Sequence, residues 1–141
     1  MRSLSDVFQA GKVDIVFNGH VHNYQRSYPL KFRISDVGKP GRTAWKDLVG
    51  KPVKGTFAID RKFDGKTQTH PRGIIYIVTG AGGQSLYDPE QEAQPETWQS
   101  FTAKFKSTVH SFTVVDIHGS DLRLKQISED GDVLDQIEVT K

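Results

Sequence analysis

The chain has no cysteine, and its longest uninterrupted apolar run, residues 74–78, is five residues long. Without cysteine, disulfides, thiolate zinc sites, iron–sulfur ligation and a cysteine nucleophile are excluded. A membrane-spanning helix needs about 20 apolar residues, so the sequence predicts no membrane partner. The first residues show no apolar stretch of the kind found in signal peptides, and the compartment stays open.

The net charge is also small: 19 basic and 17 acidic side chains leave +2. The two halves differ, however: residues 1–72 hold 14 basic and 6 acidic side chains, and residues 73–141 hold 5 and 11. A basic half can indicate an anionic ligand or nucleic acid. The basic residues are scattered and not interleaved with aromatics, so a solvated, lysine-rich region is preferred and nucleic-acid binding is the less favoured alternative.

The length of 141 residues is typical of one domain. The sequence predicts an α/β domain that is rich in strands, with one short N-terminal helix. Ser3 or Ser5 is expected to cap this helix, with Gly11 in the C′ position. Two short runs, 13–17 and 73–79, are mostly apolar and β-branched, which predicts buried strands.

The density of glycine and proline in residues 35–72 predicts a loop insertion with at most one short strand. Residues 110–141 are expected to form a β-meander, because Gly119-Ser120 and Asp130-Gly131 are good tight-turn dipeptides. A bulge near Lys125 would bring Ile127 into phase. The further strands are expected at 28–34, 56–59, 111–117, 121–127 and 133–139.

The residues with the clearest chemical potential are His20 and His22, which follow the first predicted strand directly. Imidazole is the commonest metal donor in proteins, and an extended backbone would place both rings on one side. Gly19 allows the backbone to turn sharply before them. Two ligands do not complete a site, since zinc needs three or four and octahedral ions need six. The remaining ligands are therefore distant in this sequence or lie outside it.

The run from Val13 to Ser27, with Gly19-His20-Val21-His22-Asn23-Tyr24-Gln25-Arg26 at its centre, resembles the last metal-binding motif of the calcineurin-like metallophosphoesterases. It is most similar to the purple acid phosphatase branch, in which Gly-His-x-His is followed by Tyr-Glu-Arg. Residues 73–83, which end in Gly-Ala-Gly-Gly, resemble a later strand and turn of that family, and residues 110–135 resemble its C-terminal hairpins. The resemblance implies the C-terminal half of an α-β-β-α sandwich of mostly antiparallel strands, spanning residues 1–141.

This resemblance implies phosphoester hydrolysis at a dinuclear metal centre, with His20 binding one ion and His22 the other. Iron, zinc, manganese and magnesium all stay open as the metal. By the same resemblance Gly19, Tyr24 and Arg26 support the turn, although Gln25 replaces the usual glutamate. Gly80, Gly82, Gly83 and His110 are candidates for lining the substrate pocket.

The other motifs of that family are absent here: Asp-x-His, Gly-Asp, Gly-Asn-His and a separate upstream histidine. The chain is therefore expected to be inactive alone and to need an N-terminal half as partner. Apolar strand faces left uncovered predict self-association. A non-catalytic scaffold or binding module is the alternative interpretation.

Overall fold

The computed structural model describes residues 2–35 and 53–141, so residues 36–52 of the predicted insertion lie outside the described residues. Two helical segments lead the chain, and a short helix and a 3-10 turn lie between the fifth and sixth strands. The elements in chain order are η1 (Arg2–Leu4), α1 (Ser5–Ala10), β1 (Ile15–Asn18), β2 (Tyr24–Ser27), β3 (Leu30–Ile34), β4 (Gly55–Ile59), β5 (Ile75–Thr79), α3 (Pro89–Glu92), η2 (Pro95–Thr97), β6 (Thr102–Lys106), β7 (Ser111–His118), β8 (Asp121–Ser128) and β9 (Val133–Thr140).

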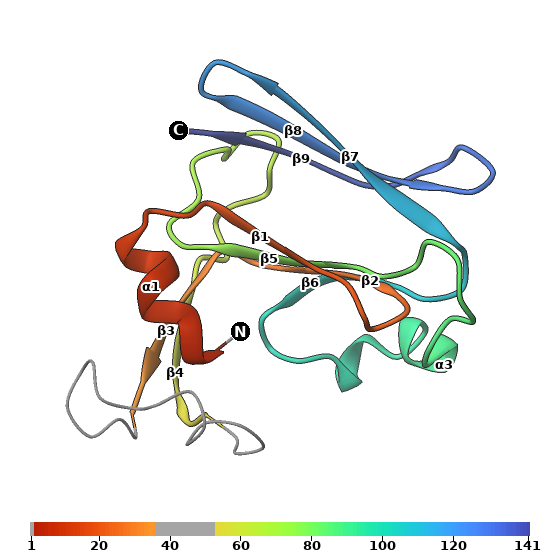
Figure 1. The fold of residues 1–141 in the computed structure, drawn as a ribbon, viewed down its shortest axis with the longest axis horizontal. Helices are drawn as coiled ribbons and strands as arrows, with labels where there is room; N and C mark the ends of the chain where they lie inside the picture. The colour runs from red at the N-terminus through yellow and green to blue at the C-terminus, as the bar shows by residue number, and fades with distance from the viewer. Residues whose placement is uncertain (1, 36–52) are drawn as a thin grey trace.

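The strands form two stacked sheets and a separate hairpin, as Figure 1 shows. One sheet has the strand order β1-β5-β2-β6, with β1 parallel to β5 and the other pairs antiparallel. The antiparallel meander β7-β8-β9 covers one face of it, and α1 and the β3–β4 hairpin lie toward the other face. The strand-rich, mostly antiparallel architecture with a short N-terminal helix is as predicted.

The core lies between the two sheets. Ile75 and Ile77 of β5 are fully buried, and they belong to one cluster with Leu124 and Ile137 of the covering meander. Because β5 has a neighbour on each side and layers on both faces, its run of apolar residues is accounted for. The prediction of a buried strand over residues 73–79 is confirmed.

The first strand differs from the prediction, because it is an edge strand and not a buried one. β1 pairs with β5 alone among the described strands, and Phe17 is 44% exposed. A run of apolar residues predicts a buried strand, but it does not show whether the chain also contains the second neighbouring strand that would bury it. The predicted helix is present, but Leu4 holds the N-cap position, and Gly11 has a right-handed φ of −74°.

Several elements were not predicted, among them β2, β6 and α3. β2 lies in the polar stretch after His22 and contains Arg26, a charged residue that argues against a buried strand. Arg26 is accommodated there because it binds Asp135. The loop after β5 contains the short α3. The C-terminal meander is confirmed, and its register shift lies between Gln126 and Ile127, next to the predicted position. Within the described residues, no helix has the length and apolar character needed to cross a membrane.

Candidate metal centre

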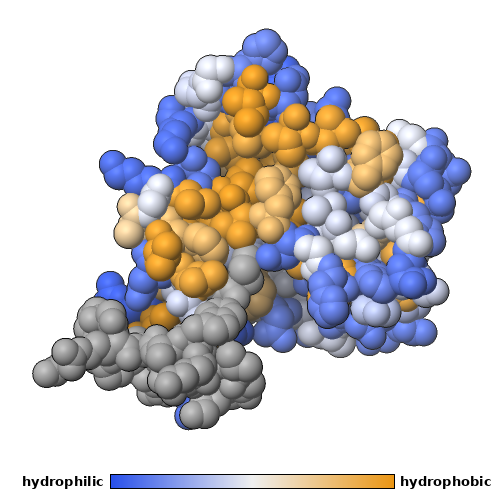
Figure 2. All heavy atoms as spheres, viewed as in Figure 1, coloured by the Kyte–Doolittle hydropathy of each residue, from blue (hydrophilic) through white to orange (hydrophobic). Residues whose placement is uncertain are grey.

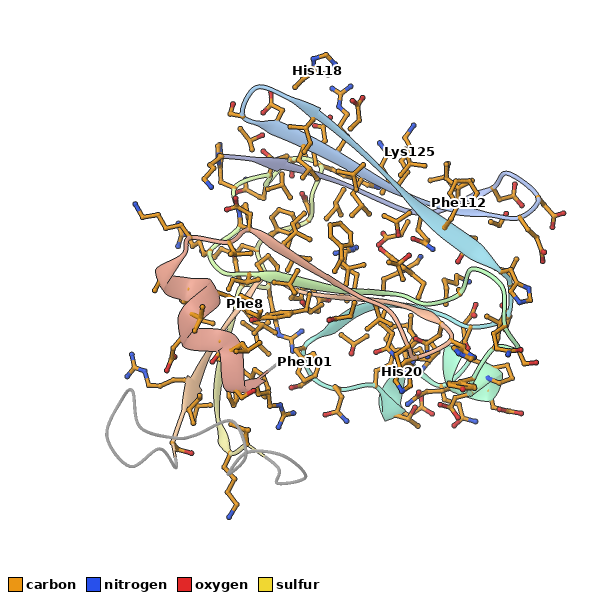
Figure 3. All side chains as sticks on the ribbon, viewed as in Figure 1. Phe8, His20, Phe101, Phe112, His118 and Lys125 are labelled. Carbon is orange, nitrogen blue, oxygen red and sulfur yellow. The ribbon has the colours of Figure 1, made fainter. Side chains whose placement is uncertain are left out.

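The two histidines lie in a tight turn that connects β1 to β2. The turn folds back through two short backbone hydrogen bonds, from Val21 N to Gly19 O (3.0 Å) and from Asn23 N to Val21 O (2.8 Å). The backbone is therefore not extended, so the condition under which i, i+2 spacing would place both rings on one side is not met. Figure 3 places His20 at this end of the sheet, with His118 at the far end of the covering meander.

The turn rests on Gly80, the residue that follows β5. Gly80 N donates to Asn23 O at 3.0 Å, and a Cβ added at Gly80 would lie 2.0 Å from Val21 O. Only glycine permits this approach without displacing the turn. The Gly-Ala-Gly-Gly segment thus begins by supporting the histidine turn from behind, whereas Gly82 and Gly83 face open space.

His20 is exposed and has a left-handed backbone, with φ of 74°. A residue with a Cβ pays a steric cost there, and such conformations persist where surrounding structure enforces them. The side chain projects from the turn without a hydrogen-bond partner among the described residues. The conformation makes the imidazole available at the cost of local backbone strain.

His22 is partly buried, and its ring is held on two sides. Its Nδ1 lies 2.9 Å from Ser85 O, and its ring stacks on Tyr87 with centroids 4.1 Å apart and an interplanar angle of 20°. A carbonyl only accepts, so Nδ1 must donate, and the lone pair of the neutral ring is then on Nε2. This is the arrangement that orients metal-binding histidines: one nitrogen fixed by a carbonyl, the other left for the ion.

The loop that supplies Ser85 and Tyr87 is itself anchored by Glu92. Its carboxylate pairs with Lys106 and accepts from Ser107 N (2.7 Å) and Thr108 N (3.0 Å), and Ser107 Oγ donates to Tyr87 O. Burial alone would raise the pKa of Glu92, but these partners together hold it below its ordinary value. The sequence gives no periodic signal for these contacts, because they join loop residues through individual hydrogen bonds.

Tyr24 and Arg26 leave the turn along β2 and meet Asp135 of β9 between the sheets. Arg26 binds the carboxylate with two parallel hydrogen bonds, Nε to Oδ2 at 2.6 Å and Nη2 to Oδ1 at 3.0 Å. Tyr24 Oη donates to Oδ2 at 2.8 Å. The side chains of Arg26 and Asp135 are 11% and 8% exposed, so the pair is largely removed from water.

The pKa values of this trio reflect the competition between burial and pairing. Burial and the neighbouring Asp135 charge raise the pKa of Tyr24 well above its ordinary value. Burial would raise the pKa of Asp135, but its contacts with Arg26 outweigh that and lower it. Burial would lower the pKa of Arg26, and Asp135 raises it instead. The trio is thus a neutral phenol and an ion pair that join β2 to β9.

The remaining candidate residues are divided between two places. Gly82, Gly83 and His110 line a shallow depression together with Glu129, whose Oε1 lies 3.8 Å from His110 Nδ1. His110 Nε2 lies 3.1 Å from Gln84 O. Gly80 does not line this depression but supports the turn. Residues 82–85 therefore contact both histidines: Gln84 O lies against His110, and Ser85 O lies against His22.

No group of three metal-binding side chains occurs in the described parts of the chain. The nearest carboxylate in sequence, Asp14, lies at the other end of β1 and pairs with Lys141 at 2.9 Å. Two imidazoles, with a free Nε2 on His22, suit zinc or iron, but two ligands do not complete a metal site.

Comparisons with known proteins agree with the fold. Residues 73–136 match the family model described as iron/zinc purple acid phosphatase-like protein C. The purple acid phosphatase PPD1 from yellow lupin (Lupinus luteus) seeds has a similar structure, with a TM-score of 0.55 and 24% sequence identity over 97% of this chain. Residues 73–136 therefore resemble the C-terminal region of purple acid phosphatase-like proteins. The whole chain spans 19% of the lupin chain. Among curated proteins, no match was found.

The purple acid phosphatase-like match begins at residue 73 and so does not include the histidine turn. It does include Gly80, Ser85 and Tyr87, which contact that turn, and Asp135, which binds Arg26. The matched segment is therefore the part of the chain that supports the turn in space.

Proposed function

We propose that the complete protein hydrolyses phosphoesters at a dinuclear metal centre and that this chain contributes His20 to one ion and His22 to the other. The observation that supports this most is the fixed ring of His22, with Nδ1 bound to Ser85 O and Nε2 free. The metal pair would supply Lewis-acid activation of the phosphoester. Alone, with two of the ligands, this chain is inactive.

The chain's own residues then have separate tasks in this proposal. His20 and His22 bind, Ser85 and Tyr87 orient the second ring, and Gly80 fixes the turn that carries both. Arg26 and Tyr24 hold β2 to the covering sheet through Asp135. Gly82, Gly83 and His110 border the depression beside the turn and would contact the substrate side.

The test is metal content by elemental analysis of the complete protein and of His20→Gly, His22→Ala and the control His118→Ala. About two ions per chain are expected in the parent and the control, with loss in both turn variants. His20→Gly should lose metal without losing stability. Because glycine relieves the strain of the left-handed backbone, the free energy of unfolding should stay unchanged or rise by up to about 1 kcal/mol. Full metal content in both turn variants would contradict the proposal.

We further infer that the missing N-terminal half docks along β1 and over the adjoining gap between the sheets. β1 is an edge strand, and Phe17 faces the covering meander because it alternates with Asn18 and shares its face with Ile15. On the opposite sheet, Val115 and Ile117 share a face with the buried Leu124 through the β7–β8 register, yet are 38% and 65% exposed. Figure 2 shows a broad hydrophobic area over α1, β1 and the upper sheet.

Self-association of the isolated chain follows from the same surface. Light scattering of the 141-residue chain should show dimers or larger species, and Ile117→Lys should shift them toward monomer. The matched control is Val133→Lys, which is 54% exposed on the outer face of the meander. A monomeric, highly stable chain would argue against an uncovered edge.

A further inference from the structure

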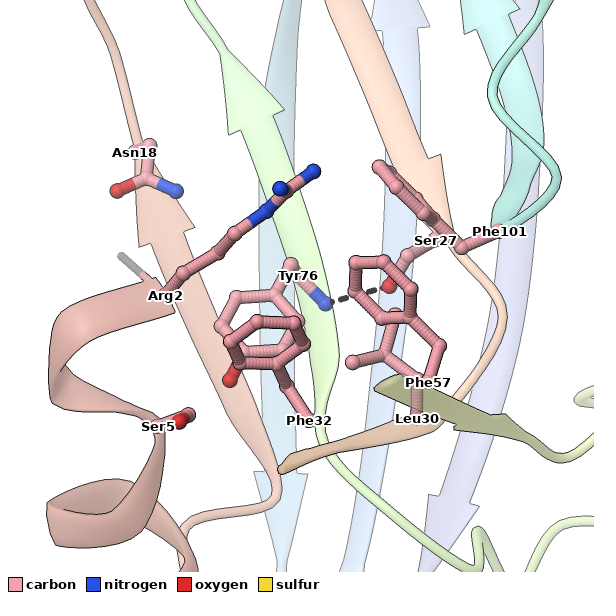
Figure 4. Close-up of a pocket in the computed structure, with 9 residues that line it drawn as sticks. All are labelled: Arg2, Ser5, Asn18, Ser27, Leu30, Phe32, Phe57, Tyr76 and Phe101. Carbon is pink, nitrogen blue, oxygen red and sulfur yellow. Dashed lines mark hydrogen bonds between the residues drawn. The ribbon is translucent and has the colours of Figure 1, made fainter. Parts of the chain in front are cut away.

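A cavity of about 170 Å³ lies on the other face of the β1-β5-β2-β6 sheet, away from the covering meander (Figure 4). Its walls are aromatic: Tyr76 comes from β5, Phe32 and Phe57 from the β3–β4 hairpin, and Phe101 from the residue before β6. The rings of Phe32 and Phe57 have centroids 4.9 Å apart, and those of Phe57 and Phe101 are 5.1 Å apart. A planar molecule would meet ring faces and edges on several sides.

Five lining residues have polar side chains: Arg2, Ser5, Asn18, Ser27 and Tyr76. Ser5 and Arg2 each have hydrogen-bonding capacity to offer a ligand. Ser5 lines it and is 1% exposed, and its Oγ has no hydrogen-bond partner among the described residues. A buried hydroxyl without a partner is uncommon, because it loses its bonds to water and gains none in return. The serine therefore offers a hydrogen bond to whatever occupies the cavity.

Arg2 supplies the charge. Its guanidinium carbon lies 5.2 Å from the ring centroid of Phe57 and 5.6 Å from that of Phe32. In the described structure it makes one long hydrogen bond, from Nη1 to Val53 O at 3.4 Å, which leaves most of its five donors free. A guanidinium held against aromatic rings, with donors to spare, suits a carboxylate.

We propose that this cavity binds a small molecule with one aromatic ring and one carboxylate. An apolar cavity of about 150 Å³ in another protein holds benzene, so a cavity of 170 Å³ has room for a ring and a small substituent. The ring packs among Phe32, Phe57 and Tyr76. Figure 4 shows the Arg2 guanidinium pointing away from Ser5. On binding, the Arg2 side chain turns toward α1, and the carboxylate then accepts from the guanidinium and from Ser5 Oγ. The site is distinct from the histidine turn and needs no metal.

The probe is benzoate, titrated into the ¹⁵N-labelled 141-residue chain and followed by amide chemical shifts, with benzene and cyclohexanecarboxylate as comparisons. Saturable binding of benzoate is expected, with the largest shifts around the cavity-lining residues. Arg2→Ala should weaken benzoate binding by about tenfold or more and benzene binding little. Ser5→Ala should weaken benzoate binding several-fold without loss of folding, since the hydroxyl has no partner to lose. Arg123→Ala, on the outer face of the meander, is the control.

The titration is repeated on the complete protein. Binding there, with the same dependence on Arg2 and Ser5, supports the proposal. Absence of saturable binding to the chain would overturn it, as would equal affinity in Arg2→Ala, Ser5→Ala and Arg123→Ala. Binding to the chain that disappears in the complete protein would also overturn it, because another part of the protein would then fill the cavity. None of these outcomes depends on metal content, so a failure here is separable from a failure of the phosphoesterase proposal.

Discussion

Two regions between the sheets are built differently, one around β2 and β9 and the other along the edge strand β1. At β2, the space between the sheets is closed by the buried trio of Arg26, Asp135 and Tyr24. At β1, inward-facing apolar side chains such as Phe17 and Ile117 are exposed, and no described strand covers the edge. The region around β2 and β9, which we call the closed side, is completed by contacts within the chain. The region along β1, which we call the open edge, presents a surface that an additional layer would bury.

The histidine turn lies between these two sides, because it leaves the open-edge strand β1 and enters β2. Its support comes from within the chain, through Gly80, Ser85 and Tyr87. Its ligand set, in contrast, is incomplete: one histidine for each proposed ion leaves two or three further ligands to be supplied. A partner that covered the open edge would arrive beside the turn. The incomplete edge and the incomplete ligand set therefore have the same explanation in our proposal.

The strongest way to break the closed side is Asp135→Ala. Loss of the carboxylate leaves Arg26 charged and 11% exposed without its partner, and leaves Tyr24 without an acceptor. Breaking a buried pair in this way costs about 3–5 kcal/mol of unfolding free energy. Urea denaturation measures the loss, and failure to fold under conditions where the parent folds counts as the same result.

The matched control is Asp132→Ala, three residues earlier and exposed, for which a change below about 0.5 kcal/mol is expected. If Asp135→Ala costs less than about 1 kcal/mol, the trio does not hold the closed side. The contrast with the open edge would then disappear.

The trio should also make stability depend on pH at both ends of the scale. Because the pKa of Asp135 is lowered by folding, the unfolded chain binds a proton first, and stability falls as pH drops below about 4. Because the pKa of Tyr24 is raised, the unfolded chain releases its proton first, and stability falls as pH rises above about 10.

Stability measured by urea denaturation between pH 2 and 11 checks both arms. Asp64 and Glu92 also have lowered pKa values and contribute to the acid arm, so Asp135→Asn should make that arm shallower without abolishing it. Burial also raises the pKa of Tyr76, so Tyr24→Phe should make the alkaline arm shallower without abolishing it. Unchanged profiles in both variants would show that the trio is not the cause.

The predictability of these regions from sequence follows the kind of interaction that forms them. The meander is readable because alternation and turn dipeptides such as Asp130-Gly131 are local signals, and β5 because a run of apolar residues needs burial. The buried position of Arg26 could not be predicted, because a charged residue argues against a buried strand and its partner Asp135 is 109 positions away. The histidines were found by motif, but the contacts of Ser85 and Tyr87 depend on loop conformation.

The smallest expected effect concerns the ring of Tyr87, which is 46% exposed. Tyr87→Ala removes the stack on His22 but keeps the backbone bonds from Tyr87 N to His22 O and from Ser107 Oγ to Tyr87 O. Exposed stacking contributes little, so we expect a stability loss below about 1 kcal/mol. The imidazole, however, should become mobile, with ¹⁵N and ¹³C signals of His22 averaging between the two tautomers. Tyr87→Phe retains the ring and should preserve the signals of the parent. A His22 ring that stays fixed as the Nε2-free tautomer in Tyr87→Ala would mean that the Ser85 carbonyl alone orients it.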